Sequence, residues 1–184
     1  HRKAPTRRAF GRFEASTINE IWTGDAMHGR FLVAGAHKPV LFAFIDDHSR
    51  LLVGYRWGRS EDTVRLEAAF RHGLSSRGVP RSVYVDNGAA YIASPLLRTC
   101  AVLGVRLVHS KPRRPEGRGK IERFFRTVRD QFLVEIDVHP PDDLAGLNRL
   151  FTGWVETVYN QRPHTETGET PMARFTNSGV PPAI

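Results

Sequence analysis

The sequence predicts an α/β domain with a mixed five-stranded sheet flanked by helices. After residue 20 the chain has three β-rich runs in succession, which is typical of an antiparallel meander. Its second half alternates helical and strand-like segments, which favours parallel strands with helices packed on the sheet. With 184 residues, 40% of them hydrophobic, and no internal repeat, the chain suits one domain with tails.

The three runs predict strands over residues 21–27, 39–45 and 51–57. Residues 46–50 between the last two runs are polar and typical of a turn, so those two strands should form a hairpin. The longest apolar run is far too short to span a bilayer, so we expect no membrane partner.

A helix is expected after the third strand. Ser60 can cap its first turn, and Glu61 and Asp62 suit the positive end of the helix dipole. The hydrophobic positions predict that this helix buries Val64, Leu66, Ala68, Phe70 and Leu74.

The elements that follow alternate in type. We expect a strand over residues 81–85, a helix over 94–103 closed by Gly104, and a strand over 105–109. Residues 111–119 combine prolines, glycines and basic residues, which indicates a loop.

Two longer helices complete the expected core. The first begins at Lys120, and the second spans residues 144–159 after Asp142 and Asp143. A short helical turn is expected at residues 171–175. The first helix should bury Ile121, Phe124, Phe125, Val128 and Phe132.

The charge of the chain indicates a polyanionic partner. The net charge is +8, and all but four of the 27 basic residues are arginines. Arginine meets phosphate oxygens through a planar fork of donors, so nucleic acid is the expected partner. A GC-rich genome would explain the preference for arginine over lysine, but it would not explain the net charge.

The chain divides into a basic arm at residues 1–18, a core at 19–160 and a C-terminal extension at 161–184. It begins without methionine, so we expect it to be part of a longer protein. The single cysteine, Cys100, cannot form an internal disulfide, and we expect it to be buried in a reducing, intracellular setting.

Three acidic residues are candidates for a metal site. Asp25 lies in the first predicted strand, Asp86 follows a short buried strand, and Glu122 lies in the first turns of a helix. Open α/β folds place their sites at strand ends. Three adjacent carboxylates need a cation, and hard divalent ions such as Mg²⁺ take such oxygen ligands.

Each residue also has a simpler interpretation. Glu122 could belong to a surface ion-pair network, Asp25 could be an ordinary edge-strand carboxylate, and Asp86 could begin a tight turn. Asp46 and Asp47 could be ligands, but a hairpin turn explains them. His28, three residues past Asp25, could touch metal or substrate, but a structural or solvent-facing role is expected. Trp22 and Trp57 are expected in the core.

At this point the sequence resembles a known family, the integrase core of retroviral integrases and bacterial insertion-sequence transposases. The resemblance covers residues 21–175, with 35 residues separating the last two acidic positions. One departure follows Asp25, where related transposases have a hydroxyl residue and this chain has Ala26-Met27. The motifs that carry the resemblance are Trp22-Thr23-Gly24-Asp25, Phe44-Ile45-Asp46-Asp47-His48-Ser49-Arg50, Val85-Asp86-Asn87-Gly88, Glu122, Tyr159-Asn160-Gln161-Arg162-Pro163-His164 and Thr170-Pro171.

The resemblance implies an RNase H-like fold and a DDE triad of Asp25, Asp86 and Glu122. It implies a polynucleotidyl transferase that cuts DNA at a 3′ end and transfers the strand. The expected cofactors are two divalent metal ions, Mg²⁺ or Mn²⁺. Expected partners are transposon ends, target DNA, further copies of the chain and accessory transposition proteins. The expected setting is the bacterial cytoplasm, with the enzyme acting on the nucleoid.

Basic residues beside Glu122 are candidates for contacts to DNA phosphates. Two other functions remain open, namely a nuclease of the same fold without strand transfer and a catalytically silent DNA-binding scaffold. The candidate contacts are Lys111, Arg113, Arg114, Arg118, Lys120 and Arg123.

Overall fold

The computed structural model describes residues 14–29, 38–60, 63–111 and 117–178, and the statements below concern these residues. Their strands form one sheet in the order β3-β2-β1-β4-β5. β1 pairs antiparallel with β2, and β2 with β3, whereas β1, β4 and β5 run parallel. The predicted mixed five-stranded sheet is therefore confirmed. The strands are β1 (Ile21–His28), β2 (Val40–Asp46), β3 (Leu52–Gly58), β4 (Ser82–Val85) and β5 (Arg106–His109).

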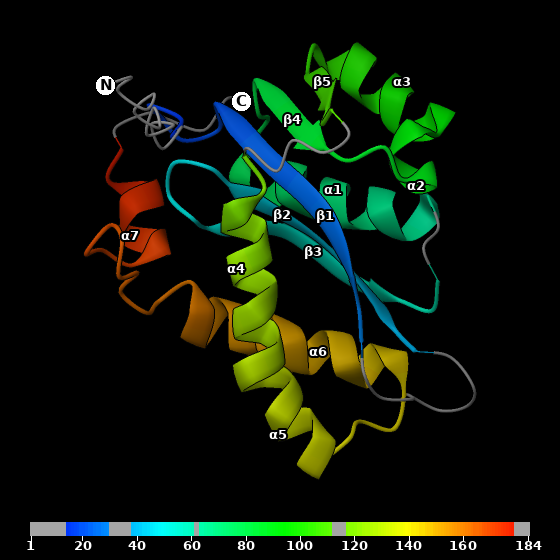
Figure 1. The fold of residues 1–184 in the computed structure, drawn as a ribbon, viewed down its shortest axis with the longest axis vertical. Coiled ribbons are helices and arrows are strands. Elements are labelled where there is room, and N and C mark those ends of the chain that lie inside the picture. The colour runs from blue at the N-terminus through cyan, green and yellow to red at the C-terminus, as the bar shows by residue number, and fades with distance from the viewer. Residues whose placement is uncertain (1–13, 30–37, 61–62, 112–116, 179–184) are drawn as a thin grey trace, which may run out of the picture.

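Helices cover both faces of this sheet, with α4 crossing the near face in Figure 1 and α1 lying behind the strands. Two of the helices contain a π-helical segment. α4 continues through η1 into α5, and α6 continues into η2. The bounds are α1 (Thr63–Arg77), α2 (Ala89–Ile92), α3 (Ser94–Leu103), α4 (Gly119–Thr127), η1 (Val128–Phe132), α5 (Leu133–Val138), α6 (Leu144–Trp154), η2 (Val155–Tyr159) and α7 (Pro171–Thr176).

The core consists of two hydrophobic clusters, one on each face of the sheet. Along β2, Leu41 and Ala43 belong to the cluster under α4, α5 and α6, while Phe42 and Phe44 belong to the cluster under α1, α2 and α3. This alternation is the side-chain period of a strand covered on both faces. It explains why β2 reads as a continuous apolar run.

The predicted buried stripe of α1 was wrong at Val64, which is 64% exposed, and at Ala68, which is exposed. The helix instead buries Leu66, Ala69, Phe70 and Gly73, which have the i, i+3, i+4, i+7 spacing of one helical face. Small residues are needed there because α1 lies directly against β3. A Cβ at Gly54 would stand 2.4 Å from the Ala69 carbonyl oxygen. The predicted acidic start, Glu61 and Asp62, lies outside the described residues.

Two asparagines bind the outer edge of β3, the last strand of the sheet. Asn160 accepts from the Leu52 N–H at 3.1 Å and donates to the Leu52 carbonyl at 3.5 Å. Asn148 makes the same pair of bonds to Trp57, at 2.9 and 3.1 Å. Side-chain amides thus take the place of a neighbouring strand, which an open sheet edge otherwise lacks.

Both ends of the described chain pack on the core. Arg174 in α7 donates to the His48 carbonyl at 2.8 Å and pairs with Glu14 at 2.5 Å. Ala15 and Ile18, in the predicted arm, are buried. The boundaries at residues 18 and 160 remain predictions. No helix in the described part of the chain is long and apolar enough to cross a membrane.

Candidate active site

Strand pairing brings Asp25 and Asp86 together. β1 and β4 run parallel, and the last pair of the register is Thr23 with Tyr84. Continuing that register by two residues sets Asp86, the first residue after β4, beside Asp25. The middle of β1 and the end of its parallel neighbour β4 therefore bring the two aspartates side by side.

The loop that holds Asp86 is fixed by hydrogen bonds at its base. Asp86 Oδ1 accepts from the Gly88 N–H at 2.8 Å, so Asp86 begins a tight turn. Asn87 donates to the Ser110 carbonyl at 2.9 Å, and Ser110 N–H donates to the Val85 carbonyl at 2.7 Å. The other carboxylate oxygen of Asp86, Oδ2, faces the guanidinium of Arg118.

Arg118 stands between the two aspartates, directly before α4. Its Nη2 is 2.5 Å from Asp25 Oδ2 and 3.8 Å from Asp86 Oδ2. Its Nε is buried and has no hydrogen-bond partner among the described residues. Burial raises the pKa of the Asp25 carboxyl, although hydrogen bonds from the Ala26 N–H and from Arg118 act in the opposite direction.

Glu122 lies one helical turn beyond Arg118, and its N–H donates to the Arg118 carbonyl at 3.1 Å. Its side chain is exposed, and its negative charge acts on the Arg118 guanidinium. Within the described residues, no three acidic, histidine or cysteine side chains gather closely enough to hold a metal ion. The structure therefore brings Asp25 and Asp86 together, and the full triad stays a prediction.

The donor set suits a hard divalent cation. Asp25 and Asp86 both turn a carboxylate oxygen toward one positive group, the guanidinium of Arg118. Mg²⁺ and Mn²⁺ bind to carboxylate oxygens of this kind, with water completing the coordination. Two of the three predicted ligands therefore have the chemistry that such an ion needs, and the metal site itself stays a prediction.

The neighbouring aspartates serve the hairpin. Asp46 accepts from Asn19 N–H and from Ser49 N–H and Oγ, and burial raises its pKa. Asp47 accepts from the Ala15 N–H at 2.6 Å and from Lys120 Nζ at 2.7 Å. The interpretation of both residues as parts of a turn is confirmed, because the Arg50 N–H closes the turn onto the Asp46 carbonyl.

The predicted DNA contacts have mixed surroundings. Lys111 is exposed, whereas Arg113 and Arg114 lie outside the described residues. Arg118 pairs with Asp25, Lys120 with Asp47, and Arg123 with Glu166. Sequence reasoning missed the contacts of Arg118 with Asp25 and Asp86, which come from distant parts of the chain.

Comparison with known families decides which fold family this is. A model described as "Integrase core domain" matches residues 15–115, more than half of the chain, and a second model with that description matches residues 103–171. The chain belongs to the integrase core domain family. Its fold is the RNase H-like fold that the resemblance implied.

Relatives of this integrase core include bacterial transposases and a viral polyprotein. The transposase of transposon Tn552 from Staphylococcus aureus is 26% identical over 90% of this chain and 39% of that protein. A transposase of an IS21-like element from Bacteroides fragilis is 26% identical over 90% of this chain and 32% of that protein. The Gag-Pro-Pol polyprotein of human T-cell leukemia virus 3 is 27% identical over 64% of this chain and 8% of its own length. The chain thus spans well under half the length of these relatives.

Solved structures agree on the fold of this core. An intasome of simian T-cell lymphotropic virus, in complex with a PP2A regulatory subunit, matches with a TM-score of 0.78 at 19% identity. That match covers 94% of this chain and 59% of that one. The HTLV-2 integrase catalytic core domain in complex with magnesium matches with a TM-score of 0.70 at 18% identity, over 87% of this chain and 98% of that one.

Proposed function

We propose that this integrase core is the catalytic domain of a DDE-type transposase or integrase. It would hydrolyse a phosphodiester at a transposon end, which leaves a 3′-hydroxyl, and then direct that hydroxyl to attack a phosphodiester of target DNA. The observation that carries the proposal is the approach of Asp25 and Asp86 to one guanidinium, with Glu122 one helical turn away. No covalent bond between protein and DNA is needed in either step.

Asp25, Asp86 and Glu122 would hold the metal, which we propose to be two Mg²⁺ or Mn²⁺ ions. Divalent ions in such sites polarise phosphoryl oxygens and lower the pKa of bound water. Asp86 is held in place by its bond to the Gly88 N–H, and Asp25 by its place in the central strand β1. Glu122 is exposed, and the proposal requires a rotamer of its side chain that points toward the other two.

DNA is the proposed substrate, and the charge of +8 supports it. One matching structure is described as an intasome and another as a dimeric form of a catalytic core. We propose that this chain likewise acts as an oligomer on paired DNA ends, within a longer bacterial protein and together with accessory transposition proteins.

Asp86→Asn tests the proposal. The substitution keeps the acceptor for the Gly88 N–H and removes the negative charge, so the chain should still fold. We expect 3′-end cleavage and strand transfer to fall by at least about 1,000-fold, as for the loss of an essential electrostatic group. DNA binding should change little. Mn²⁺ affinity, measured by calorimetry, should fall as well.

Asp142→Asn is the matched control, because Asp142 is exposed and lies between α5 and α6, far from the start of α4 in Figure 1. It should leave all three measurements unchanged. Full strand transfer by the Asp86→Asn variant in Mg²⁺ would refute the assignment. Cleavage by the wild-type protein without joining of pre-cut ends would identify a nuclease instead. DNA binding by the wild-type protein without any metal-dependent reaction would identify a silent scaffold.

A further inference from the structure

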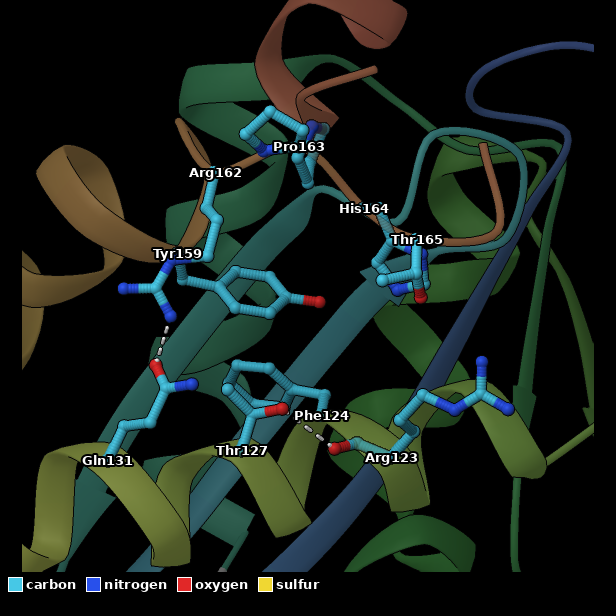
Figure 2. A pocket seen from close by; sticks show the side chains of 10 residues that line it. Arg123, Phe124, Thr127, Gln131, Tyr159, Arg162, Pro163, His164 and Thr165 are labelled. Carbon is cyan, nitrogen blue, oxygen red and sulfur yellow. Dashed lines mark hydrogen bonds between the residues drawn. The ribbon is translucent and has the colours of Figure 1, made fainter. Parts of the chain in front are cut away.

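We propose that a hollow beside α4 binds a backbone phosphate of the DNA, a site distinct from the carboxylates. This inference rests on the proposed function, since it needs DNA as the ligand. We call the hollow the α4 pocket, and Figure 2 shows it between α4 and the residues that follow η2. It is lined by Arg123, Phe124, Thr127, Gln131, Tyr159, Arg162, Pro163, His164, Thr165 and Pro171.

The pocket lies along one face of the continuous helix that α4 and η1 form. Arg123, Thr127 and Gln131 are four residues apart and so form one stripe along α4 and η1. At about 1.5 Å per residue, this stripe extends about 12 Å along the helix. It begins one residue beyond Glu122, so a strand bound at the carboxylates passes close to the pocket.

The lining is suited to an anion. Arg123 and Arg162 stand on two sides of the hollow in Figure 2, and none of the described lining residues is acidic. Arg162 is exposed and donates to Gln131 Oε1 at 2.8 Å. A guanidinium has five N–H donors, so this one bond leaves capacity for phosphate oxygens. The hydroxyl of Thr165 adds a further polar group to the lining, whereas that of Thr127 donates to the Arg123 carbonyl at 3.2 Å.

The size of the cavity, about 170 Å³, limits what can enter. Small-molecule sites commonly have about 300–1,000 Å³. A single phosphodiester group of a longer ligand is therefore a better match than a free nucleotide.

The far wall of the pocket is rigid. Tyr159 donates to the Arg50 carbonyl at 3.3 Å, and Asn160 is buried and bound to β3. Arg162 follows two residues later and precedes Pro163, whose ring fixes the backbone. Its bond to Gln131 also restrains the guanidinium, which reduces the conformational entropy that is lost on binding. This gives a physical role to the motif at residues 159–164, which the triad does not use.

Charge around the pocket favours DNA over an acidic peptide. Glu166 pairs with Arg123 and neutralises part of the pocket, so the remaining attraction comes from Arg162 and from the wider surface. Arg126 and Arg129 are exposed on the same helical segment, in a chain of net charge +8. A row of cations of this kind matches the regular charge spacing of a nucleic-acid backbone.

The first test measures DNA affinity against salt concentration for Arg162→Gln, with a duplex of random sequence. One phosphate contact contributes about 0.9 to the slope of log K against log salt. We expect the slope to fall by about one and the affinity to fall about 3- to 10-fold, to a similar degree for every sequence. Arg98→Gln, which removes an exposed arginine from α3 on the other face of the sheet, should leave the slope unchanged.

The second test is covalent and does not depend on affinity. A Thr165→Cys variant should attack a pyridyl disulfide tethered to a backbone phosphate of the duplex, which forms a mixed disulfide with the DNA and releases thiopyridone. Cys100, the only native cysteine, is buried, so it should contribute little cross-linking of its own. Asn177→Cys, at an exposed position outside the pocket, should cross-link far less.

Three results would overturn the proposal. These are a wild-type salt slope in Arg162→Gln, equal cross-linking at residues 165 and 177, and protection of the Thr165→Cys thiol by a poly-glutamate peptide but not by DNA. Both tests run without metal and in the Asp86→Asn background as well. A failure of the pocket is therefore distinguishable from a failure of the proposed catalysis.

Discussion

A single guanidinium, that of Arg118, faces Asp25 at 2.5 Å and Asp86 at 3.8 Å, and Glu122 acts on it from one helical turn away. Adjacent carboxylates repel each other, and a positive charge between them offsets this repulsion. Gly117, at φ +90°, and Gly119 flank Arg118, and a Cβ at Gly119 would meet nothing within 4 Å. Arg118 therefore lies between two residues without side chains, and the positive φ of Gly117 is one that favours glycine.

Burial of Asp25 leads to a prediction about stability and pH. Its folded-state pKa is raised, so the ionised carboxylate is less favourable in the fold than in the unfolded chain. Stability is therefore lost as the pH rises from the unfolded pKa, about 3.9, through the folded value. Asp25→Asn removes this loss. We expect it to raise the free energy of unfolding at pH 7 above that of the wild-type protein.

Urea unfolding between pH 3 and pH 8 measures the effect of Asp25→Asn. The gain should shrink as the pH falls toward 3, where Asp25 is protonated in both states of the wild-type protein. Asp142→Asn, at an exposed position, should show no such pH dependence. A destabilised Asp25→Asn variant at pH 7 would mean that the bond to Arg118 outweighs the cost of burial.

At this scale the sequence predicted the meeting of Asp25 and Asp86 but not the partner they share. Asp86 could be placed because it follows a short buried strand, whose end is where open α/β folds place their sites. Asp25 lies within β1 and not at its end. Arg118 was assigned to DNA because it lies in a basic loop. Its bond to Asp25 spans 93 residues of sequence, and no local pattern encodes a contact of that range.

Among the elements, β3 depends on side chains for its outer edge. Asn148 from α6 and Asn160, directly after η2, each bind both backbone groups of one β3 residue. Buried N–H and C=O groups without partners are costly. These two asparagines therefore fix the α6–η2 segment against the sheet and close an edge that could otherwise pair with another chain.

Asn160→Ala tests this role. Asn160 is fully buried, and its removal leaves the Leu52 N–H and carbonyl without partners at that edge. Each unsatisfied buried group costs about 1–3 kcal/mol, so we expect a loss of about 2–4 kcal/mol in the free energy of unfolding. Chemical denaturation checks it. Asn177→Ala, at an exposed position, should lose less than about 0.5 kcal/mol, and an equal loss in both variants would contradict the assignment.

Helices could be predicted where the spacing of hydrophobic residues and the capping residues indicated the same element. α3 ends at Gly104, whose φ of 69° suits glycine, and Asp143 caps α6 by accepting from the Gly146 N–H. The buried face of α1 was not predictable, because it is set by the approach to Gly54 and includes Gly73. A glycine contributes no hydrophobic signal to the sequence pattern.

For the whole molecule, ion pairs join segments from both ends of the chain. Arg50 is buried in the β2–β3 turn, pairs with Glu14 at 2.9 Å and lies 3.6 Å from Glu166. Glu14 also pairs with Arg174 in α7. Buried charges need their partners, since removing one of them commonly costs about 3–5 kcal/mol. The residues after 160 therefore help to keep Arg50 paired.

Deletion of residues 161–184 is the corresponding prediction. It removes Glu166 and Arg174 from the ion pairs, and it uncovers the core beneath Met172 and Phe175, which pack against the cluster under α1. We expect the shortened chain to lose at least about 3 kcal/mol of stability, from the loss of a buried charge partner together with apolar burial. Thermal melts followed by circular dichroism should show a large fall in Tm or no cooperative transition.

Two single substitutions are the controls. Arg174→Gln removes only the ion pairs of Arg174, so its Tm should lie between those of the shortened and the full chain. Arg56→Gln, at an exposed position of β3, should have the Tm of the full chain. A shortened chain that melts at the Tm of the full chain would instead support a core that ends at residue 160.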